Sequence, residues 1–203
     1  MPKLLLILLL SLCSAGAAAK SSAKTILVLG DSISAAYGIA VERGWVSLLQ
    51  KRFDERHPGS YSVVNASISG DTTALGLRRL PPLLAQHAPD QVIVELGGND
   101  GLRGLPLTNM RDNLQAIIDL CLDSGAEVVL VSIDLPPSYG AVFNDRYRAV
   151  FEELEKTNDL FRVSLGFNLL GDRDLVQADG IHPTAEAQPL LLDAVWPAIS
   201  PEG

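Results

Sequence analysis

The order of apolar runs along the chain is the feature that most limits its fold. Five short apolar runs alternate with longer segments of helical spacing. The runs are continuous rather than strictly alternating, as in parallel strands buried on both faces. They lie at Thr25–Leu29, Tyr61–Asn65, Gln91–Leu96, Glu127–Ile133 and, more weakly, Leu160–Val163. This pattern predicts an α/β fold with a central, mostly parallel sheet of about five strands.

Helices are predicted between these strands. Their ranges are Glu42–Arg56, Thr73–His87, Leu107–Ser124, Asn144–Asn158 and Thr184–Ile199, the last with a kink or end at Pro189 and Pro197. The spacing of Met110, Leu114, Ile117 and Cys121 predicts one buried helix face. Cys121 is therefore interpreted as a small hydrophobic residue and not as a thiol nucleophile. Two long segments without regular pattern, Gly97–Pro106 and Ser164–Pro183, are candidates for functional loops.

The first 19 residues have the three parts of a secretory signal peptide. Lys3 supplies a positive charge, Leu4–Leu12 is apolar, and small residues lead to an A-x-A-like site at Ala17–Ala19. The whole apolar stretch is shorter than the roughly 20 residues that span a bilayer, which disfavours an uncleaved anchor. We expect a signal peptide at residues 1–19, one domain at residues 20–203, a secreted or periplasmic protein, and no stable membrane span after cleavage.

Composition excludes several classes of protein. The 203 residues carry a formal net charge of −8, whereas a nucleic-acid binder needs a basic face. Hydrophobic residues make up 47% and charged residues only 20%, which excludes a disordered chain. Two cysteines cannot form a disulfide scaffold, and the sequence has no HExxH motif, Cys/His cluster or Walker A motif. No metal site or nucleic-acid partner is predicted.

Polar residues that suit acyl transfer follow the predicted strands, where the ligand crevice of an open parallel sheet lies. Ser32 follows the first strand and is a candidate nucleophile, which needs a base to take its proton. His182 is the candidate base, since imidazole titrates near neutrality. Asp179, three residues earlier, is the candidate acid that would orient the ring of His182.

An acyl-transfer site also needs fixed donors for the negative oxygen of the tetrahedral intermediate. The candidate donors are the backbone N–H groups of Ser32 and Gly70 and the side-chain amide of Asn99. Losing one such donor typically costs about 10²–10³ in turnover.

Other residues near these positions have simpler interpretations. Asp31 and Asp100 are expected to brace their loops through backbone hydrogen bonds, and Asp71 to cap a helix. Glu95 is given no role. Apolar residues in or near the loops could contact an acyl chain, with ordinary core packing as the alternative. The substrate-contact candidates are Leu75, Leu77, Leu135 and Tyr139.

Four segments, in order, resemble the sequence blocks of the SGNH, or GDSL-type, serine hydrolases. Gly30–Ser32 (GDS) resembles the nucleophile block, Gly70 the second, Gly97–Asp100 (GGND) the third, and Asp179–His182 (DGIH) the fourth. Longer matches at residues 65–72 (NASISGDT) and 94–104 (VELGGNDGLRG) resemble the bacterial thioesterase I / protease I / lysophospholipase (arylesterase) subgroup.

The resemblance implies a flavodoxin-like, three-layer α/β/α fold and a monomeric esterase without cofactor. It implies fatty acyl thioesters, aryl or short-chain esters and lysophospholipids as substrates. Two residues depart from the pattern: Ala36 stands where members often have Gly, and Asp134 where they often have Arg. Neither belongs to the implied catalytic set.

Three alternatives use the same residues or the same fold. A carbohydrate deacetylase would accept acetyl groups only, a non-catalytic lipid-binding protein would use the pocket without the chemistry, and an acyltransferase would pass the acyl group to another alcohol.

Overall fold

The computed structural model describes residues 23–165 and 173–199, and within them five parallel strands form one sheet. The strands are β1 (Lys24–Gly30), β2 (Tyr61–Asn65), β3 (Gln91–Glu95), β4 (Glu127–Ile133) and β5 (Phe161–Leu165). Each differs from its predicted range by two residues at most at either end. The α/β class with a five-stranded parallel sheet is thereby confirmed.

The order of the strands in the sheet is β2-β1-β3-β4-β5. Val28 of β1 lies opposite Asn65 of β2 on one side and Ile93 of β3 on the other. The chain thus winds away from β1 in both directions, and the strand order reverses between β1 and β3. Ligands of such sheets bind beyond the carboxyl ends of the strands at this reversal.

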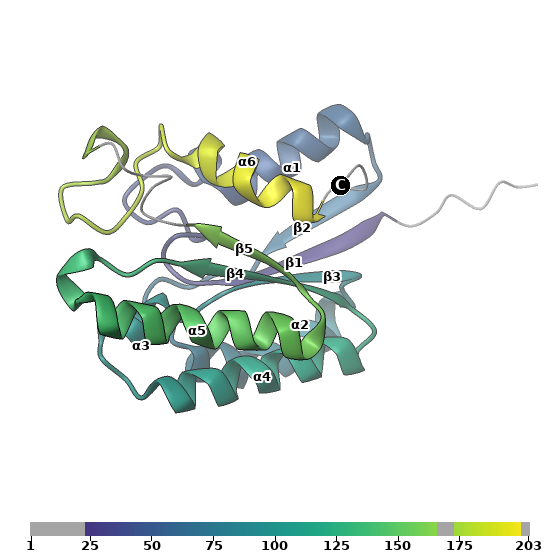
Figure 1. The fold of residues 1–203 in the computed structure, drawn as a ribbon. Coiled ribbons are helices and arrows are strands. Elements are labelled where there is room, and N and C mark those ends of the chain that lie inside the picture. The colour runs from purple at the N-terminus through teal and green to yellow at the C-terminus, as the bar shows by residue number, and fades with distance from the viewer. Residues whose placement is uncertain (1–22, 166–172, 200–203) are drawn as a thin grey trace, which may run out of the picture.

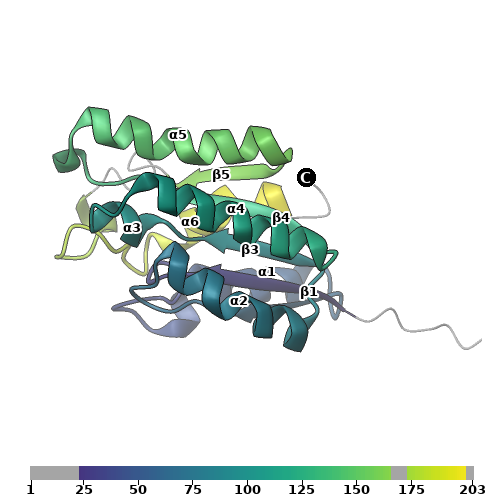
Figure 2. The same cartoon turned by 90° about the horizontal axis from the view of Figure 1, so that it is seen from below.

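Helices cover both faces of the sheet, which makes a three-layer molecule (Figure 1). One layer holds α1 (Trp45–Arg56) and α6 (Gln188–Ile199), which contact each other. The other layer holds α2 (Thr73–His87), α4 (Leu107–Asp123) and α5 (Ala141–Asn158), which lie side by side in Figure 2. The short helix α3 (Gly98–Leu102) follows β3, and short 3-10 turns lie at Val41–Arg43, Pro137–Tyr139 and Arg173–Leu175.

The hydrophobic core has two parts, one on each face of the sheet. Alternate residues of β1 supply both: Leu27 and Leu29 join the part under α2, α4 and α5, and Ile26 and Val28 join the part under α1 and α6. The predicted stripe on α4 is confirmed, since Cys121 and the other three residues are fully buried. Burial of both faces explains the continuous apolar runs.

Several predicted elements differ from the structure. The helix expected over Glu42–Arg56 is interrupted at Gly44, whose extended backbone separates a 3-10 turn from α1. The segment Gly97–Pro106, expected to be irregular, contains α3. The helix expected from Thr184 begins at Gln188, so Pro189 lies in its first turn, and it ends at Ile199 after Pro197. The predicted signal peptide lies outside the described residues.

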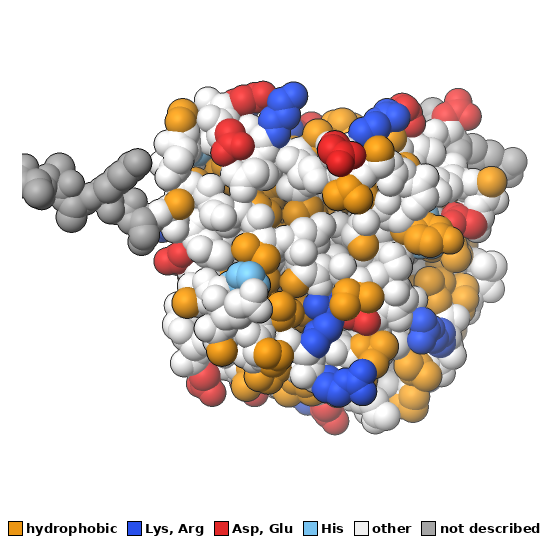
Figure 3. Space-filling view, turned by 180° about the vertical axis from the view of Figure 1, so that it is seen from behind, with side chains coloured by type: hydrophobic (Ala, Val, Ile, Leu, Met, Phe, Trp, Pro, Cys, Tyr) orange, Lys and Arg blue, Asp and Glu red, His pale blue; other side chains and the backbone are white. Residues whose placement is uncertain are grey.

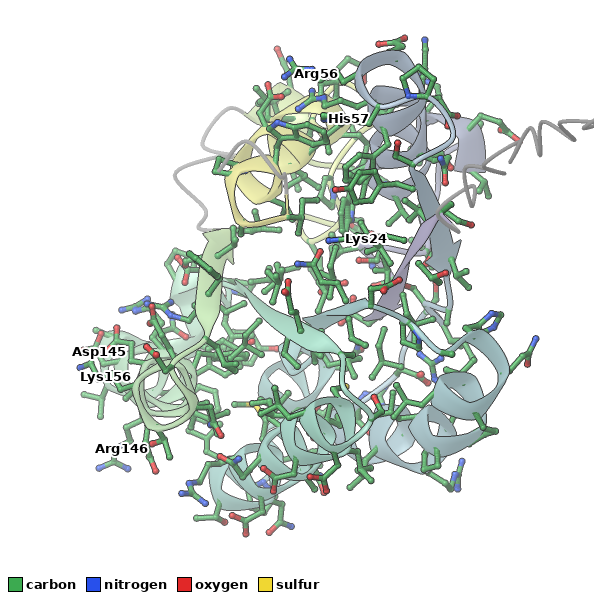
Figure 4. All side chains as sticks on the ribbon, turned by 90° about the vertical axis from the view of Figure 1, so that its right-hand side faces the viewer. Lys24, Arg56, His57, Asp145, Arg146 and Lys156 are labelled. Atoms are coloured by element: carbon green, nitrogen blue, oxygen red, sulfur yellow. The ribbon has the colours of Figure 1, made fainter. Side chains whose placement is uncertain are left out.

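Figure 4 looks onto the end where the strands begin, with Lys24 of β1 near its centre and Asp145, Arg146 and Lys156 of α5 at one side. The face that lies behind in Figure 1 carries acidic and basic side chains interspersed (Figure 3).

Within residues 23–165 and 173–199, no helix is long and apolar enough to cross a membrane, and no cluster of three or more His, Cys, Asp or Glu could hold a metal ion.

Candidate active site

Three of the sequence-predicted residues form one hydrogen-bonded chain at the carboxyl end of the sheet. Nε2 of His182 lies 2.8 Å from Oγ of Ser32, and Nδ1 of His182 lies 2.6 Å from Oδ2 of Asp179. Ser32 comes from the turn after β1, whereas the other two come from the segment before α6. Serine, imidazole and carboxylate in this order can move a proton away from an attacking hydroxyl.

The segment that carries His182 is held by local and distant hydrogen bonds. Oδ1 of Asp179 accepts the backbone N–H groups of Ile181 (2.9 Å) and His182 (3.0 Å), which fixes the turn between acid and base. Gln177 donates its side-chain amide to the carbonyl of Tyr37 (2.8 Å) and to that of Pro183 (2.9 Å). These contacts tie the histidine segment to the loop after β1.

The carboxyl group of Asp179 is strongly biased toward its charged form. Partial burial raises its pKa, but hydrogen bonds from the side chain and backbone of His182 and from the N–H of Ile181 outweigh this and lower the pKa to about 2. The side chain of His182 is only 16% exposed, so most of its ring is shielded from water. A carboxylate at this position favours the imidazolium that forms when the ring accepts a proton.

The nucleophile turn is built on a close approach that only glycine allows. A Cβ at Gly30 would lie 2.7 Å from Cβ of Ser34 and 2.8 Å from Oε2 of Glu95. Both neighbours are buried and hydrogen-bonded to each other, so a shift of either one would cost free energy. Gly30 therefore lets the chain turn directly at the end of β1 and present Ser32 at the edge of the sheet.

The three candidate oxyanion donors differ in how they are held. The Asn99 amide donates to Oδ2 of Asp31 at 3.0 Å, and Asn99 and Ser32 both line the same pocket. Neither the N–H of Ser32 nor that of Gly70 donates a hydrogen bond to a described residue.

Gly70 does not line that pocket, but its loop is fixed beside the end of β1. The N–H of Ile68 donates to the carbonyl of Gly30 at 3.1 Å, and the carbonyl of Gly70 accepts Nη2 of Arg103 at 2.9 Å. The backbone of Gly70 has φ of +85°, in the left-handed region that favours glycine.

An apolar pocket opens beside Ser32. Its apolar wall comes from the turn after β1, α3, the end of β4 and the loop after it, the end of β5, the histidine segment and α6. The apolar lining residues are Ile33, Leu102, Ile133, Leu135, Pro136, Leu165, Ile181, Pro183 and Leu191. Such a wall can hold the hydrocarbon part of a substrate whose carbonyl lies at Ser32.

Of the four predicted substrate contacts, the structure places one in this pocket. Leu135 lines the wall. Leu77 packs against the core under α2, and Leu75, half-buried, does not line the pocket. Tyr139 is 39% exposed and donates its hydroxyl to the carbonyl of Leu102 at 2.8 Å. The sequence did not indicate that Ile133, Leu165 and Leu191 line the pocket. Their positions there depend on contacts between elements that are far apart in the chain.

The flanking acids have structural partners. Asp31 braces the nucleophile turn, as expected, by accepting the N–H of Ile33 at 3.1 Å. Asp100 accepts the N–H (2.9 Å) and the hydroxyl (2.6 Å) of Thr73, which joins α3 to the start of α2.

The prediction that Asp71 caps a helix is wrong. The N-cap of α2 is Thr72, whose hydroxyl accepts the N–H of Leu75, and Asp71 pairs with Nε of Arg79 at 2.6 Å. The guanidinium of Arg79 also donates to the carbonyls of Gly30 and Ala66, so this ion pair braces the loops after β1 and β2. The sequence could not reveal a partner about two helix turns beyond the cap.

Two residues that received no role from the sequence lie within the site. The ring of Tyr37 lies 4.4 Å from that of His182, centroid to centroid. Glu95, at the end of β3, is buried and accepts the hydroxyl of Ser34 at 2.7 Å. The only sequence signal for Glu95 was a charged residue at the end of a buried strand.

The two departures from the resembled pattern lie near the site. Ala36 is buried and has φ of +59°, a conformation that glycine adopts at less cost. Asp134 lines the pocket and lies 3.9 Å from Nη1 of Arg148.

A doubly wound parallel sheet that holds serine, histidine and aspartate in contact beside an apolar pocket has the architecture of acyl-transfer hydrolases. Comparison with known proteins agrees with this class. Residues 28–189 match the GDSL-like Lipase/Acylhydrolase family. The chain is 47% identical over 188 residues to Esterase TesA of Pseudomonas aeruginosa, covering 90% of each chain.

Two further proteins are similar over most of their length. Thioesterase 1/protease 1/lysophospholipase L1 of Escherichia coli is 40% identical over 182 residues, which cover 89% of this chain and 86% of that protein. The crystal structure of the psychrotrophic esterase EstA from Pseudoalteromonas sp., inhibited by monoethylphosphonate, superimposes with a TM-score of 0.81 at 40% identity, covering 87% of this chain and 96% of that one. The chain therefore belongs to the GDSL-like, or SGNH, lipase/acylhydrolase family, and it is an esterase of that family.

Proposed function

We propose that this esterase hydrolyses acyl esters and thioesters through Ser32, His182 and Asp179 by way of an acyl-enzyme. The observation that carries this proposal is the chain of two short hydrogen bonds from Oγ of Ser32 through His182 to Asp179, at the mouth of an apolar pocket.

In the first half of the reaction, Oγ of Ser32 attacks the acyl carbonyl carbon while Nε2 of His182 takes the hydroxyl proton. The negative oxygen of the tetrahedral intermediate accepts hydrogen bonds from the N–H groups of Ser32 and Gly70 and from the Asn99 amide. The intermediate then collapses: its bond to the leaving oxygen or sulfur breaks, and His182 returns the proton to the leaving group.

In the second half, a water molecule gives a proton to His182 and attacks the acyl-enzyme. The bond to Oγ of Ser32 breaks, the proton returns to Oγ, and the carboxylic acid leaves. Asp179 stays ionised throughout and stabilises the imidazolium in both halves.

The substrates we propose are fatty acyl thioesters, aryl or short-chain esters and lysophospholipids. The apolar wall formed by Leu135, Leu165 and Leu191 supports acyl groups longer than acetyl. Three related proteins carry the names esterase and thioesterase/lysophospholipase, which supports the same range. We further propose that the protein acts as a monomer outside the cytoplasm, after removal of residues 1–19.

A chain-length series tests the substrate class. Rates of hydrolysis of p-nitrophenyl esters from acetyl to dodecanoyl, and of matched acyl thioesters, should stay within about tenfold up to at least octanoyl. Activity confined to acetyl would instead support a carbohydrate deacetylase. Absence of turnover on every ester and thioester, in a folded protein that binds fatty acid, would support a non-catalytic lipid-binding protein.

Product analysis with added alcohols separates hydrolysis from acyl transfer. Free carboxylic acid should dominate even with glycerol present, whereas a dominant glycerol ester would assign the site to acyl transfer.

A further inference from the structure

Two buried acids, Asp31 and Glu95, take no part in the proposed mechanism, although both are close in sequence to residues that do. Asp31 is 2% exposed and Glu95 is 1% exposed. Asp31 precedes the proposed nucleophile in sequence, and Glu95 ends β3, four residues before Asn99. Buried carboxyl groups are costly unless hydrogen bonds or a shared proton compensate for the lost hydration.

Glu95 is hydrogen-bonded to the turn that carries Ser32. Its Oε2 accepts the hydroxyl of Ser34 at 2.7 Å and the backbone N–H of Asp31 at 3.3 Å. Its carboxyl group lies close enough to that of Asp31 for a negative charge on one to disfavour a negative charge on the other.

Asp31 continues the chain of contacts to the candidate oxyanion site. Its Oδ1 accepts the N–H of Ile33 at 3.1 Å, and its Oδ2 accepts the Asn99 amide at 3.0 Å. Both oxygens of Asp31 thus accept N–H donors, as an ionised carboxylate does. These hydrogen bonds favour the negative charge on Asp31 over Glu95.

The electrostatics agree with this placement. Burial raises the pKa of Glu95 well above its usual value, and the charge of Asp31 raises it further. Burial also raises the pKa of Asp31, to about 6, while hydrogen bonds from Ile33 and Asn99 and the nearby His182 oppose that rise. Both shifts favour one shared proton over two negative charges at this pair.

We propose that protonated Glu95 and ionised Asp31 act as a pair that positions the Asn99 amide for the oxyanion. A side-chain amide has two N–H groups: one donates to Asp31, and the other is left to donate to the reacting oxygen. The carboxylate also forbids the flipped amide, whose oxygen would face Oδ2 of Asp31. Asp31 and Glu95 are positioning residues, because they act through Asn99. This inference rests on the proposed function.

Asp31→Asn tests the pair, because one amide oxygen cannot accept both the N–H of Ile33 and the Asn99 amide, and a nitrogen that faces Asn99 sets donor against donor. We expect kcat for p-nitrophenyl butyrate to fall about 10²-fold, as when an oxyanion donor is lost, with KM within about threefold. The affinity for an alkyl trifluoromethyl ketone, which forms an oxyanion on binding, should fall by a similar factor.

Asp100→Asn is the matched control. Asp100 is also 2% exposed and accepts two hydrogen bonds, but both come from Thr73. This variant should lower stability and leave kcat within about threefold. If Asp31→Asn folds and retains kcat, or if both variants lose kcat and ketone affinity equally, the inference is overturned.

Glu95→Gln provides a second test that survives a failure of Asp31→Asn to fold. The glutamine amide can donate to Asp31 while its oxygen accepts from Ser34, which reproduces the hydrogen bonds proposed for protonated Glu95. We expect kcat within about threefold of wild type, and a loss of more than tenfold in folded Glu95→Gln would contradict a proton on Glu95. Ser32→Ala separates the two proposals: if it retains activity, the proposed function itself fails.

Discussion

Nε2 of His182 lies 2.8 Å from Oγ of Ser32, although 150 residues separate them in the chain. Two features bring them together. Gly30 lets the chain turn at the end of β1 with Ser32 at the sheet edge, and Gln177 fastens the histidine segment to the carbonyl of Tyr37. The contact therefore depends on the parallel sheet, which places Ser32 at its edge, and on the long-range hydrogen bond from Gln177 to Tyr37.

The hydrogen bond between Asp179 and His182 should matter more for turnover than for folding. In Asp179→Asn, the amide oxygen can still accept the N–H groups of Ile181 and His182. The amide nitrogen then faces Nδ1 of His182 and favours the tautomer with its proton on Nε2, which cannot take the proton of Ser32. We expect kcat to fall by about 10³–10⁴ in steady-state assays.

The control for this variant is Glu186→Gln, which removes an exposed acid paired with Arg43 in the segment just before α6. It should leave kcat unchanged. Equal kcat in Asp179→Asn and wild type would exclude Asp179 from the proposed mechanism.

Stability should fall with rising pH because of Asp31. Folding raises the pKa of Asp31 from 3.8 to about 6, chiefly through burial, so the folded protein holds this proton more tightly than the unfolded chain. The resulting stabilisation is complete below pH 3.8 and is lost as the pH rises through 6.

Urea unfolding of wild type and Asp31→Asn between pH 4 and pH 7 measures this effect. The free energy of unfolding of wild type minus that of the variant should decrease by ~2 kcal/mol over this range. A difference that stays constant or increases with pH would show that Asp31 does not titrate in this way.

Gly101 lies next to Leu135 of the pocket wall, so a substitution at Gly101 can change the shape of that wall. A Cβ at this helical glycine would lie 2.6 Å from Cδ1 of Leu135 and 3.1 Å from Cε2 of Tyr147. In Gly101→Ala, Leu135 must shift, and overpacking of this kind costs about 1–3 kcal/mol. Because Leu135 lines the pocket, we expect kcat/KM for octanoyl esters to fall at least fivefold more than for acetyl esters.

Gly76→Ala is the matched control for this prediction. It also overpacks a buried helical glycine, with a Cβ 2.3 Å from Cδ1 of Leu96, but neither residue lines the pocket. Its octanoyl-to-acetyl ratio should equal that of wild type. The same change in ratio for both variants would mean that general destabilisation, and not Leu135, determines chain-length preference.

Much of the fold could be predicted from the sequence because its determinants are local. Residues of β1 are buried on both faces, so Leu27 and Val28 form a continuous apolar run that any parallel arrangement requires. The break before α1 could not be predicted, because the first N–H of that helix donates to the side chain of Gln188. A helix cap supplied 143 residues away leaves no local pattern.

The site could be predicted only where its chemistry is tied to residue type. Serine, histidine and aspartate after strand ends indicated acyl transfer, and the structure brings these three side chains into contact. The pocket wall and Glu95 could not be found this way. An apolar residue such as Leu191 has the same sequence signature whether it lines a pocket or packs in the core, and a buried glutamate shows its partners only in three dimensions.

Covalent labelling of Ser32 tests the proposed mechanism most directly. Wild-type protein and Ser32→Ala are incubated with a 4-nitrophenyl phosphonate ester, and both are measured by intact and peptide mass spectrometry and by hydrolysis of p-nitrophenyl butyrate. We predict one phosphonyl group on Ser32 of the wild type, loss of activity in proportion to labelling, and neither label nor activity in Ser32→Ala. A label on another residue, or hydrolysis by Ser32→Ala at the wild-type rate, would contradict Ser32 as the nucleophile.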